Sequence, residues 1–198
     1  MWDLKKNDTG AVVAKVLKAV FFTNNDLVRL ARRFCPHWVI QVDGTFNTNA
    51  IRMPLIDCLG VSNTSKSFLF AFCFVTSEGA DNWGFVLECL ERTVFDGLPL
   101  PRVVVADQGR GLRAIFHQVW PDAFLQFCEW HAAENIKKRL AAQKYKKDDR
   151  KAIMDLVWKY IWSPSVEDLE VNRAVMKAAM RVSEQLYIDK HWLVRRSK

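Results

Sequence analysis

The chain has 198 residues, of which 50% are hydrophobic and 12% aromatic, so it can bury a sizeable core and is not a disordered chain. No apolar run approaches the ~20 residues of a membrane span, and the first ten residues lack the apolar segment of a signal peptide. We therefore expect an intracellular soluble protein without a membrane partner. The five cysteines are odd in number and form no CxxC pair, which argues against a disulfide framework.

The net charge of +7 is concentrated in the C-terminal part of the chain. Residues 1–131 hold 13 basic and 13 acidic side chains, whereas residues 132–198 hold 16 basic and 9 acidic ones. A neutral part joined to a basic part is typical of a folded body with a surface for an anion, and nucleic acid is the commonest such partner. The alternative is a solvated, lysine-rich helical face, and charge alone leaves both open.

The first half of the chain predicts two helices followed by three strands. Residues 12–22 carry apolar groups at a helical spacing, although their β-branched residues leave a strand open. Residues 25–34 predict a short helix that ends before a proline. Strand-like runs at 38–46, 52–61 and 67–77 are joined by short links of turn residues, which favour antiparallel hairpins.

The middle of the chain predicts helices that alternate with strands. Residues 80–95 place apolar side chains on one helical face, and 110–119 do the same. The runs 101–107 and 123–128 are typical of short buried strands, and a further helix is expected to begin near Glu129. Strands separated by helices imply parallel neighbours, so three antiparallel strands lead into a βαβα stretch. This is the strand order of an RNase H-like α/β sheet.

The C-terminal part predicts helices only. From residue 148 onward one apolar stripe continues until Pro164 interrupts it. Ser165 then has the spacing of an N-cap, and the helix that it begins is expected to run to about residue 188.

Two aspartates stand at the C-terminal ends of apolar strands. Asp43 ends WVIQVD and Asp107 ends RVVVAD, and a glycine follows each within two residues. Ligands gather at the strand ends of open α/β sheets, and two facing carboxylates would need a cation between them. Mg²⁺ prefers such hard oxygen ligands, and a pair of ions would activate a water or a 3′-hydroxyl and stabilise the leaving oxygen of a phosphodiester. The alternative is that each aspartate only starts a turn.

Other candidate ligands favour a structural interpretation. Asp57, in PLIDCLGV, is a third acid in a strand-like run and could face solvent or the same site; we favour a structural role. Cys128 and His131 form CEWH, an i, i+3 pair at the passage from a strand into a helix. A structural zinc site needs four ligands, and the remaining close pair, Cys35 and His37, has a spacing unusual for zinc. We therefore favour a buried cysteine and a histidine at a helix N-terminus over zinc ligands.

Four motifs follow one another along the chain: VDGTFNTN…RMPLIDCLGV, GADNWGFVLECL, VVVADQGRGLRAI and VWPDAFLQFCEWHAAENI. They cover about residues 8–140, and in this order they resemble the transposase domain of Mutator-like elements. The resemblance implies an RNase H-like fold and a DDE triad that binds Mg²⁺ or Mn²⁺ in a two-metal arrangement. It also implies that Asp43 corresponds to the first aspartate and Asp107 to the second.

The resemblance extends to the residues after the second aspartate. Cys128 and His131 resemble the CxxH signature of the family, and Asn135 fits the asparagine that follows it. The helical part resembles the start of the insertion that precedes the third acid of the family. We therefore expect a partial RNase H-like transposase core at 1–140 and a basic helical segment at 141–198, in a truncated chain.

The third acid of the family is not assigned in this chain. The family's catalytic glutamate follows the insertion, in a context that the sequence does not reach. Glu167, Glu170 and Glu184 lie inside the helical segment, and we give none of them that role. The resemblance thus leaves enzymatic activity open, and we expect little or no Mg²⁺-dependent nicking of DNA by this chain alone.

Three functions are compatible with the residues and the resemblance. The first is a cut-and-paste transposase core that cleaves and joins transposon ends and target DNA in the nucleus. The second is a non-catalytic DNA-binding or transcription-regulatory protein of the far-red-impaired type, and the third is an inactive pseudogene product. We expect no small-molecule substrate and leave a homo-oligomer open. In the first two cases salt-sensitive phosphate contacts would come from Lys137, Lys138, Arg139, Lys144, Lys146 and Lys147.

Overall fold

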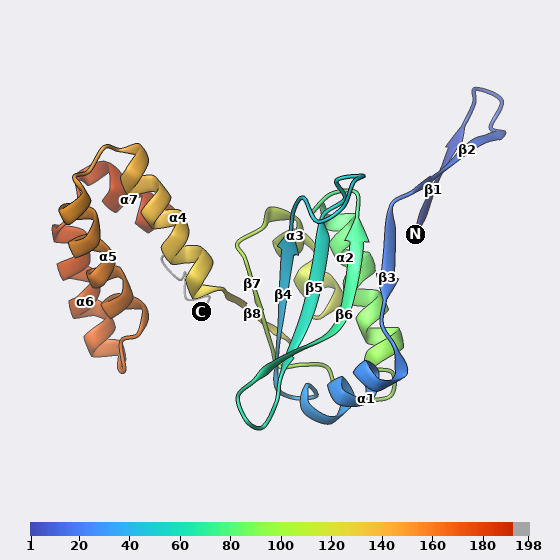
Figure 1. The fold of residues 1–198 in the computed structure, drawn as a ribbon, viewed down its shortest axis with the longest axis horizontal. Coiled ribbons are helices and arrows are strands. Elements are labelled where there is room, and N and C mark those ends of the chain that lie inside the picture. The colour runs from blue at the N-terminus through green and yellow to red at the C-terminus, as the bar shows by residue number, and fades with distance from the viewer. Residues whose placement is uncertain (192–198) are drawn as a thin grey trace. The chain divides into compact units, whose positions relative to one another are not determined.

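The computed structural model describes residues 1–191, which form parts of two compact units (Figure 1). The first unit is Met1–Phe127, and the second begins at Cys128. The expected boundary at 140/141 lies inside helix α4 (Glu129–Ala142), further along the chain than the observed division. No helix in the described residues is long and apolar enough to cross a membrane.

A six-stranded mixed sheet forms the centre of the first unit. Its strands are β3 (Ala19–Phe22), β4 (Val39–Thr45), β5 (Leu55–Val61), β6 (Ser67–Val75), β7 (Val103–Ala106) and β8 (Phe124–Phe127). Their spatial order is β3-β6-β5-β4-β7-β8. Strand β4 pairs antiparallel with β5 and parallel with β7, so the antiparallel half of the sheet meets the parallel half at β4.

The predicted strands and their directions are confirmed. β4, β5 and β6 pair as successive antiparallel neighbours, and β7 and β8 continue the sheet in parallel. The α/β class therefore follows from the pattern of short links before β6 and helical connections after it.

Helices cover one face of this sheet. They are α1 (Asn25–Phe34), α2 (Ala80–Cys89), which continues as the π-helical turn η1 (Leu90–Val94), and α3 (Arg110–Val119). Helices α2 and α3 lie behind the sheet in Figure 1, and their apolar side chains share one core with the inward residues of the strands. Asn24 caps α1, because its side chain accepts a hydrogen bond from the backbone N–H of Leu27 at 2.9 Å. The predicted helices at 25–34, 80–95 and 110–119 are confirmed.

The two faces of β4 and β5 differ in burial. Ile40 and Val42 of β4 are buried in the core shared with the helices, and Ile56 of β5 belongs to the same core. Side chains alternate between faces along a strand. Asp43 and Asp57, which are only partly buried, therefore lie on the face of the sheet that points away from these helices.

Residues 12–22 form strands, and the predicted helix is wrong. β1 (Trp2–Lys6) and β2 (Val12–Leu17) make a separate two-stranded sheet, and β3 then pairs with the edge of β6. Ala19, for example, is fully buried opposite Val75. The alternative of a strand is correct because pairing with β6 and the β-branched composition outweigh the helical spacing of the apolar groups.

The described residues of the second unit are helical. They form α4, α5 (Lys147–Ile161), α6 (Val166–Ala178) and α7 (Val182–His191), with a core of their own. Ser165 is the predicted N-cap of α6: its Oγ accepts a hydrogen bond from the backbone N–H of Asp168 at 3.0 Å. The helix predicted to reach residue 188 is two helices, because the chain turns where the backbone N–H of Arg181 donates to the hydroxyl of Tyr145 at 2.8 Å.

Candidate functional site

Asp43 and Asp107 lie toward the C-terminal ends of two neighbouring parallel strands: Asp43 is two residues before the end of β4, and Asp107 directly follows β7. The ladder between β4 and β7 sets Val42 opposite Ala106, and each aspartate is the next residue along the chain. Asp43 is half-buried, whereas Asp107 is exposed and its Oδ1 accepts the backbone N–H of Gln108 at 2.6 Å. The prediction that these two strands are neighbours is confirmed. The two aspartates directly follow the paired residues Val42 and Ala106.

Asp57 lies directly opposite Asp43 on the antiparallel partner strand. Cβ atoms of directly opposite residues are about 4.5–5.5 Å apart and share one face of the sheet. Burial raises the pKa of Asp57, and the charge of Asp43 raises it further. Asp57, Asp43 and Asp107 therefore form a row across β5, β4 and β7, which we call the carboxylate row.

A fourth carboxylate, Glu78, reaches this edge from the loop between β6 and α2. Gly44 makes room for it, because a Cβ on Gly44 would overlap Oε1 of Glu78. Burial raises the pKa of Glu78, and the charges of Asp107 and then of Asp43 raise it further. Sequence reasoning missed Glu78; the one available signal was the glycine directly after Asp43, which was interpreted only as part of a turn.

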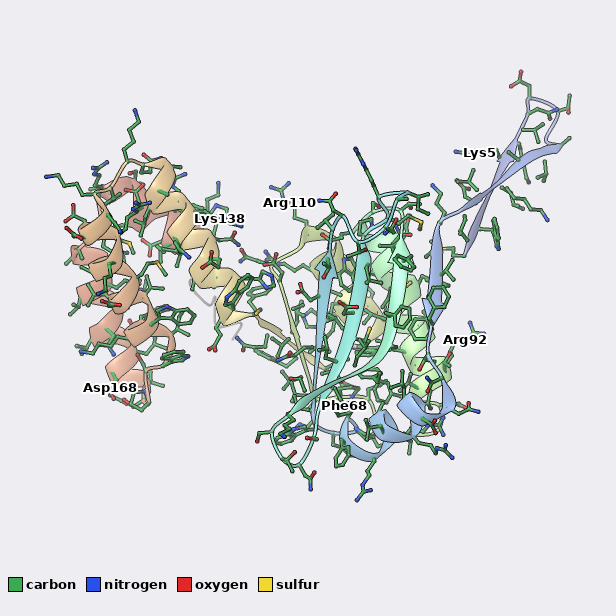
Figure 2. The ribbon with its side chains drawn as sticks, viewed as in Figure 1. Lys5, Phe68, Arg92, Arg110, Lys138 and Asp168 are labelled. Atoms are coloured by element: carbon green, nitrogen blue, oxygen red, sulfur yellow. The ribbon has the colours of Figure 1, made fainter. Side chains whose placement is uncertain are left out.

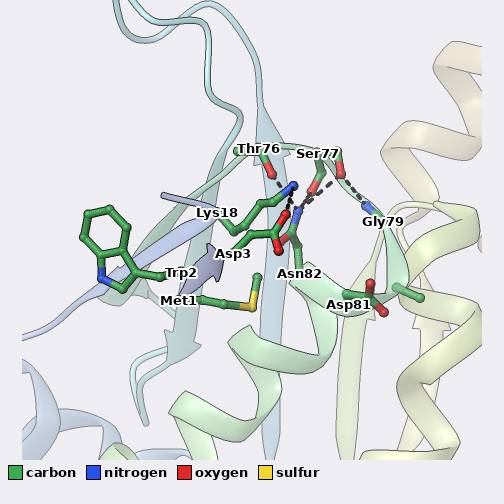
Figure 3. Close-up of a pocket in the computed structure, with 10 residues that line it drawn as sticks. Met1, Trp2, Asp3, Lys18, Thr76, Ser77, Gly79, Asp81 and Asn82 are labelled. Carbon is green, nitrogen blue, oxygen red and sulfur yellow. Dashed lines mark hydrogen bonds and ion pairs between the residues drawn. The ribbon is translucent and has the colours of Figure 1, made fainter. Parts of the chain in front are cut away.

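The loop that carries Glu78 is held by Asn82, a buried residue in the first turns of α2 (Figure 3). Nδ2 of Asn82 donates to the backbone oxygen of Ser77 at 2.8 Å and lies 3.2 Å from the Oγ of Ser77. On the other side, Gly111 of α3 allows a close approach, because a Cβ there would overlap the backbone oxygen of Glu78. The loop is thus fixed against α2 and α3. Asn82 and Lys18 both line a pocket of about 530 Å³, whose residues are drawn in Figure 3.

The donors at this edge suit a hard divalent cation. All four side chains offer carboxylate oxygens, the ligands that Mg²⁺ and Mn²⁺ prefer, and like charges at close range favour a cation between them. Within the described residues no group of three or more His, Cys, Asp or Glu is placed so that it could hold a metal ion. The donor chemistry therefore suits such a cation, although three of these carboxylates do not come together in one metal-binding group.

The family comparison covers this whole edge of the sheet. Residues 39–135 match the family described as MULE transposase domain. These residues belong to that family. The matched range begins with β4 and ends within α4, and it includes the carboxylate row and Glu78. The resemblance carried by the four sequence motifs is therefore confirmed.

One curated protein is similar to part of the chain. The PKS-NRPS hybrid synthetase cheA of Chaetomium globosum is 28% identical over 102 residues, which is 50% of this chain. The same match covers 2% of that synthetase, so the chain spans only a small part of the length of this relative. Its name therefore says nothing about the chemistry of the MULE domain.

Cys128 and His131 lie at the start of α4, in the second unit. Cys128 is the half-buried N-cap residue of the helix, and the His131 ring packs edge-on against Trp130 with 4.9 Å between ring centroids. Cys35 is fully buried in the core of the first unit. All five cysteines are free thiols, and no metal-binding group of described residues includes either Cys/His pair.

The basic residues predicted to contact DNA fall into two groups. Arg139 is packed into the second unit: its Nε lies 3.6 Å from the buried carboxylate of Glu184, and its guanidinium lies 5.0 Å from the centre of the Tyr187 ring. The others are exposed along the end of α4 and the link to α5, where Figure 2 labels Lys138. We call them the lysine cluster: Lys137, Lys138, Lys144, Lys146 and Lys147.

The three glutamates of the helical segment, Glu167, Glu170 and Glu184, lie on helices α6 and α7 of the second unit. Glu184 is 1% exposed, and its Oε2 accepts the hydroxyl of Tyr145 at 3.1 Å. Glu167 is exposed in the first turn of α6, and Glu170 faces Arg173 at 3.4 Å. Glu184 and Glu170 thus make contacts within the second unit.

Proposed function

We propose that the MULE domain is a divalent-metal-dependent core for DNA cleavage and strand transfer, with an RNase H-like fold. One observation carries the proposal: Asp43 and Asp107 each directly follow a member of the Val42–Ala106 pair, which joins the neighbouring parallel strands β4 and β7. These are the positions that resemble the first two acids of the DDE triad. The antiparallel strands β6, β5 and β4, followed by parallel β7 and β8, support the RNase H-like assignment.

Asp43 and Asp107 are the residues proposed to hold Mg²⁺ or Mn²⁺. Bound ions at such a site supply activation of a water or 3′-hydroxyl and stabilisation of the leaving oxygen of a phosphodiester. The chain itself contributes the placement of the two carboxylates on a paired, rigid part of the sheet. Arg110 stands exposed in the first turn of α3, at the same end of the sheet in Figure 2, where it can contact a DNA phosphate.

The lysine cluster is the proposed phosphate-binding surface of the second unit. Its five lysines are exposed, and Nζ of Lys137 lies 2.8 Å from Oε1 of Glu134 on the same helix. Lysines that neutralise phosphates release counterions, so the affinity should fall steeply with salt. A DNA substrate of this kind implies a nuclear protein.

A second candidate is a catalytically inactive DNA-binding regulator of the far-red-impaired type. It is favoured by the separation of the chemistry into two units: the carboxylate row belongs to the first, and the lysine cluster to the second. Phosphate binding by the lysines does not require a working metal site. DNA binding without cleavage would therefore be a coherent function for the same chain.

Nicking of supercoiled plasmid DNA tests the two candidates against each other. The chain is assayed with Mg²⁺ and with Mn²⁺ beside Asp43→Asn, Asp107→Asn and, as a control, Asp96→Asn, which changes an exposed acid after η1. We expect at most weak nicking, dependent on the metal, lost in the first two variants and kept in the control. Salt-sensitive DNA binding should persist in all four proteins. DNA binding with no nicking and no metal binding would support the inactive regulator instead.

A further inference from the structure

We propose that a cleft at the opposite end of the sheet from Asp43 and Asp107 binds one nucleotide of single-stranded DNA. The base stacks on Trp38 and Phe124, and the phosphate contacts the guanidinium of Arg102. This site goes beyond the proposed function, because it requires neither the carboxylate row nor the lysine cluster.

The cleft lies where the parallel strands β4, β7 and β8 begin. Trp38 directly precedes β4, Arg102 directly precedes β7, and Phe124 is the first residue of β8. A cavity of about 590 Å³ opens there, and its lining residues are His37, Trp38, Val39, Arg102, Val103, Asp122 and Phe124. Clefts that bind small ligands usually measure about 300–1,000 Å³, so the cavity has room for a nucleotide.

Two large aromatic side chains of this cavity are left in contact with solvent. Trp38 and Phe124 are each 60% exposed. Proteins that bind single strands place aromatic side chains where successive bases can stack on them, and this stacking tolerates any base because every base has a flat face. The exposure of both rings at one cavity therefore favours a base as the ligand.

Backbone hydrogen bonds hold the three nucleotide-binding side chains next to one another. The N–H of Arg102 donates to the carbonyl oxygen of Trp38 at 2.9 Å, and the N–H of Phe124 donates to the carbonyl oxygen of Arg102 at 2.7 Å. A second cavity of about 340 Å³ shares Arg102 and is lined by rigid residues that include Pro99, Pro101 and Pro121. Little backbone freedom is therefore left to lose when a ligand binds.

Arg102 and Asp122 give the cleft its polar chemistry. Both side chains are exposed, and both line the two cavities. A guanidinium binds phosphate through paired, charge-assisted hydrogen bonds. A carboxylate accepts a hydrogen bond from the amino group of cytosine, which thymine lacks. We therefore expect the cleft to prefer cytosine to thymine, and this preference to depend on Asp122.

Binding of a labelled oligo(dC) to the full chain, measured by fluorescence anisotropy, tests the site. The variants are Trp38→Ala, Arg102→Gln and Phe124→Ala. The matched controls are Trp2→Ala, which removes a ring that is 61% exposed on β1, and Arg92→Gln, at an exposed position of η1. We expect Kd to rise by about 5-fold or more in the three variants and to stay unchanged in the controls, with circular dichroism unchanged in all.

Two further measurements locate the ligand. An oligo(dC) that carries 5-iodocytosine should crosslink to Trp38 or Phe124 under ultraviolet light, as mass spectrometry of the peptides will show. Trp38→Phe, which keeps a ring, should bind more tightly than Trp38→Ala. Asp122→Asn should reduce the preference for oligo(dC) over oligo(dT).

Three outcomes would overturn the inference. The first is a set of cleft variants that bind oligo(dC) as tightly as the controls do. The second is crosslinking confined to residues outside the cleft. The third is a cleft that binds free dCMP but not oligo(dC), which would make the ligand a mononucleotide. If only the replacement of Lys144, Lys146 and Lys147 by glutamine weakens binding, the cleft is excluded while the lysine cluster of the proposed function stands.

Discussion

The carboxylate of Glu78 occupies the space that a side chain on Gly44 would need. The glycine is not required there for a left-handed backbone, since among the described glycines only Gly10 and Gly97 have positive φ. Its role at the end of β4 is therefore steric. Asp43 thus places its own carboxylate on one face of β4, and Gly44 leaves room for the carboxylate of Glu78 on the other face.

Alanine substitutions at Gly44, Gly109 and Gly111 should change the free energy of unfolding by different amounts, because the added Cβ meets a side chain, open space or backbone. Gly44→Ala meets the far end of a flexible side chain, so we expect almost no change in the free energy of unfolding. Gly111→Ala meets backbone atoms of Glu78 and Gly79 and should cost about 1–3 kcal/mol. Gly109→Ala, with open space around its Cβ, is the control. Urea denaturation measures all three, and equal effects at 109 and 111 would contradict the packing described.

Replacing Asp57 and Glu78 by their neutral amides should stabilise the metal-free protein. The pKa values of Asp57 and Glu78 are raised in the folded state, so the folded chain binds more protons than the unfolded chain. The free energy of unfolding therefore falls as the pH rises from the ordinary pKa values, 3.8 for Asp57 and 4.5 for Glu78, through the raised ones. Asp57→Asn and Glu78→Gln remove this loss. At pH 7 we expect a gain below about 1 kcal/mol each, since both groups are partly exposed.

Thermal unfolding between pH 4 and pH 8 without metal checks this sign. The unmodified chain should lose stability relative to the double variant as the pH rises, and Mn²⁺ should restore it in the unmodified chain only. A double variant that is less stable at pH 7 would show that these carboxylates stabilise the fold instead.

The lysine cluster should control the salt dependence of DNA binding. Replacing Lys144, Lys146 and Lys147 by glutamine should lower the slope of log K against log salt by about 0.9 for each lost phosphate contact. Lys66→Gln, in the exposed turn between β5 and β6, is the control. Fluorescence anisotropy at several salt concentrations measures the slope, and a slope that the triple variant leaves unchanged would exclude the cluster from the interface.

Glu184 should matter for the stability of the second unit and not for metal binding. Glu184→Ala leaves Arg139 and Tyr145 without their buried carboxylate and should cost about 3 kcal/mol. Glu167→Ala, at an exposed position of α6, should change stability by less than about 0.5 kcal/mol. Urea denaturation and Mn²⁺ titration are run on both. Loss of Mn²⁺ binding in a folded Glu184→Ala protein would give this residue the role of the third acid.

Local sequence signals were enough to predict the pair of aspartates. Two apolar runs of strand length, each leading to an acid, predict Asp43 and Asp107 on neighbouring strands, and the parallel ladder between β4 and β7 confirms that these strands are neighbours. The same signals did not reveal Glu78. Its contact joins residues 34 positions apart through a loop, and neither periodicity nor spacing encodes such a contact.

Two errors of secondary structure have the same kind of cause. Residues 12–22 have a helical spacing of apolar groups, yet β3 gains its stability from the edge of β6, which only the tertiary fold provides. The break after Ala178 depends on the hydroxyl of Tyr145, which comes from the turn after α4. Long-range partners decided both cases, whereas the cap at Ser165 is local and was predicted correctly.

Iron-mediated cleavage of the backbone is the most direct measurement of whether Asp43 and Asp107 share a cation. Fe²⁺ replaces Mn²⁺ in the folded chain, ascorbate and peroxide generate radicals at the bound ion, and mass spectrometry locates the cuts. We predict cuts close to residues 43 and 107, suppressed by excess Mn²⁺ and absent in Asp107→Asn. Cuts at other positions, or the same cuts in both aspartate variants, would contradict a metal site at these strand ends.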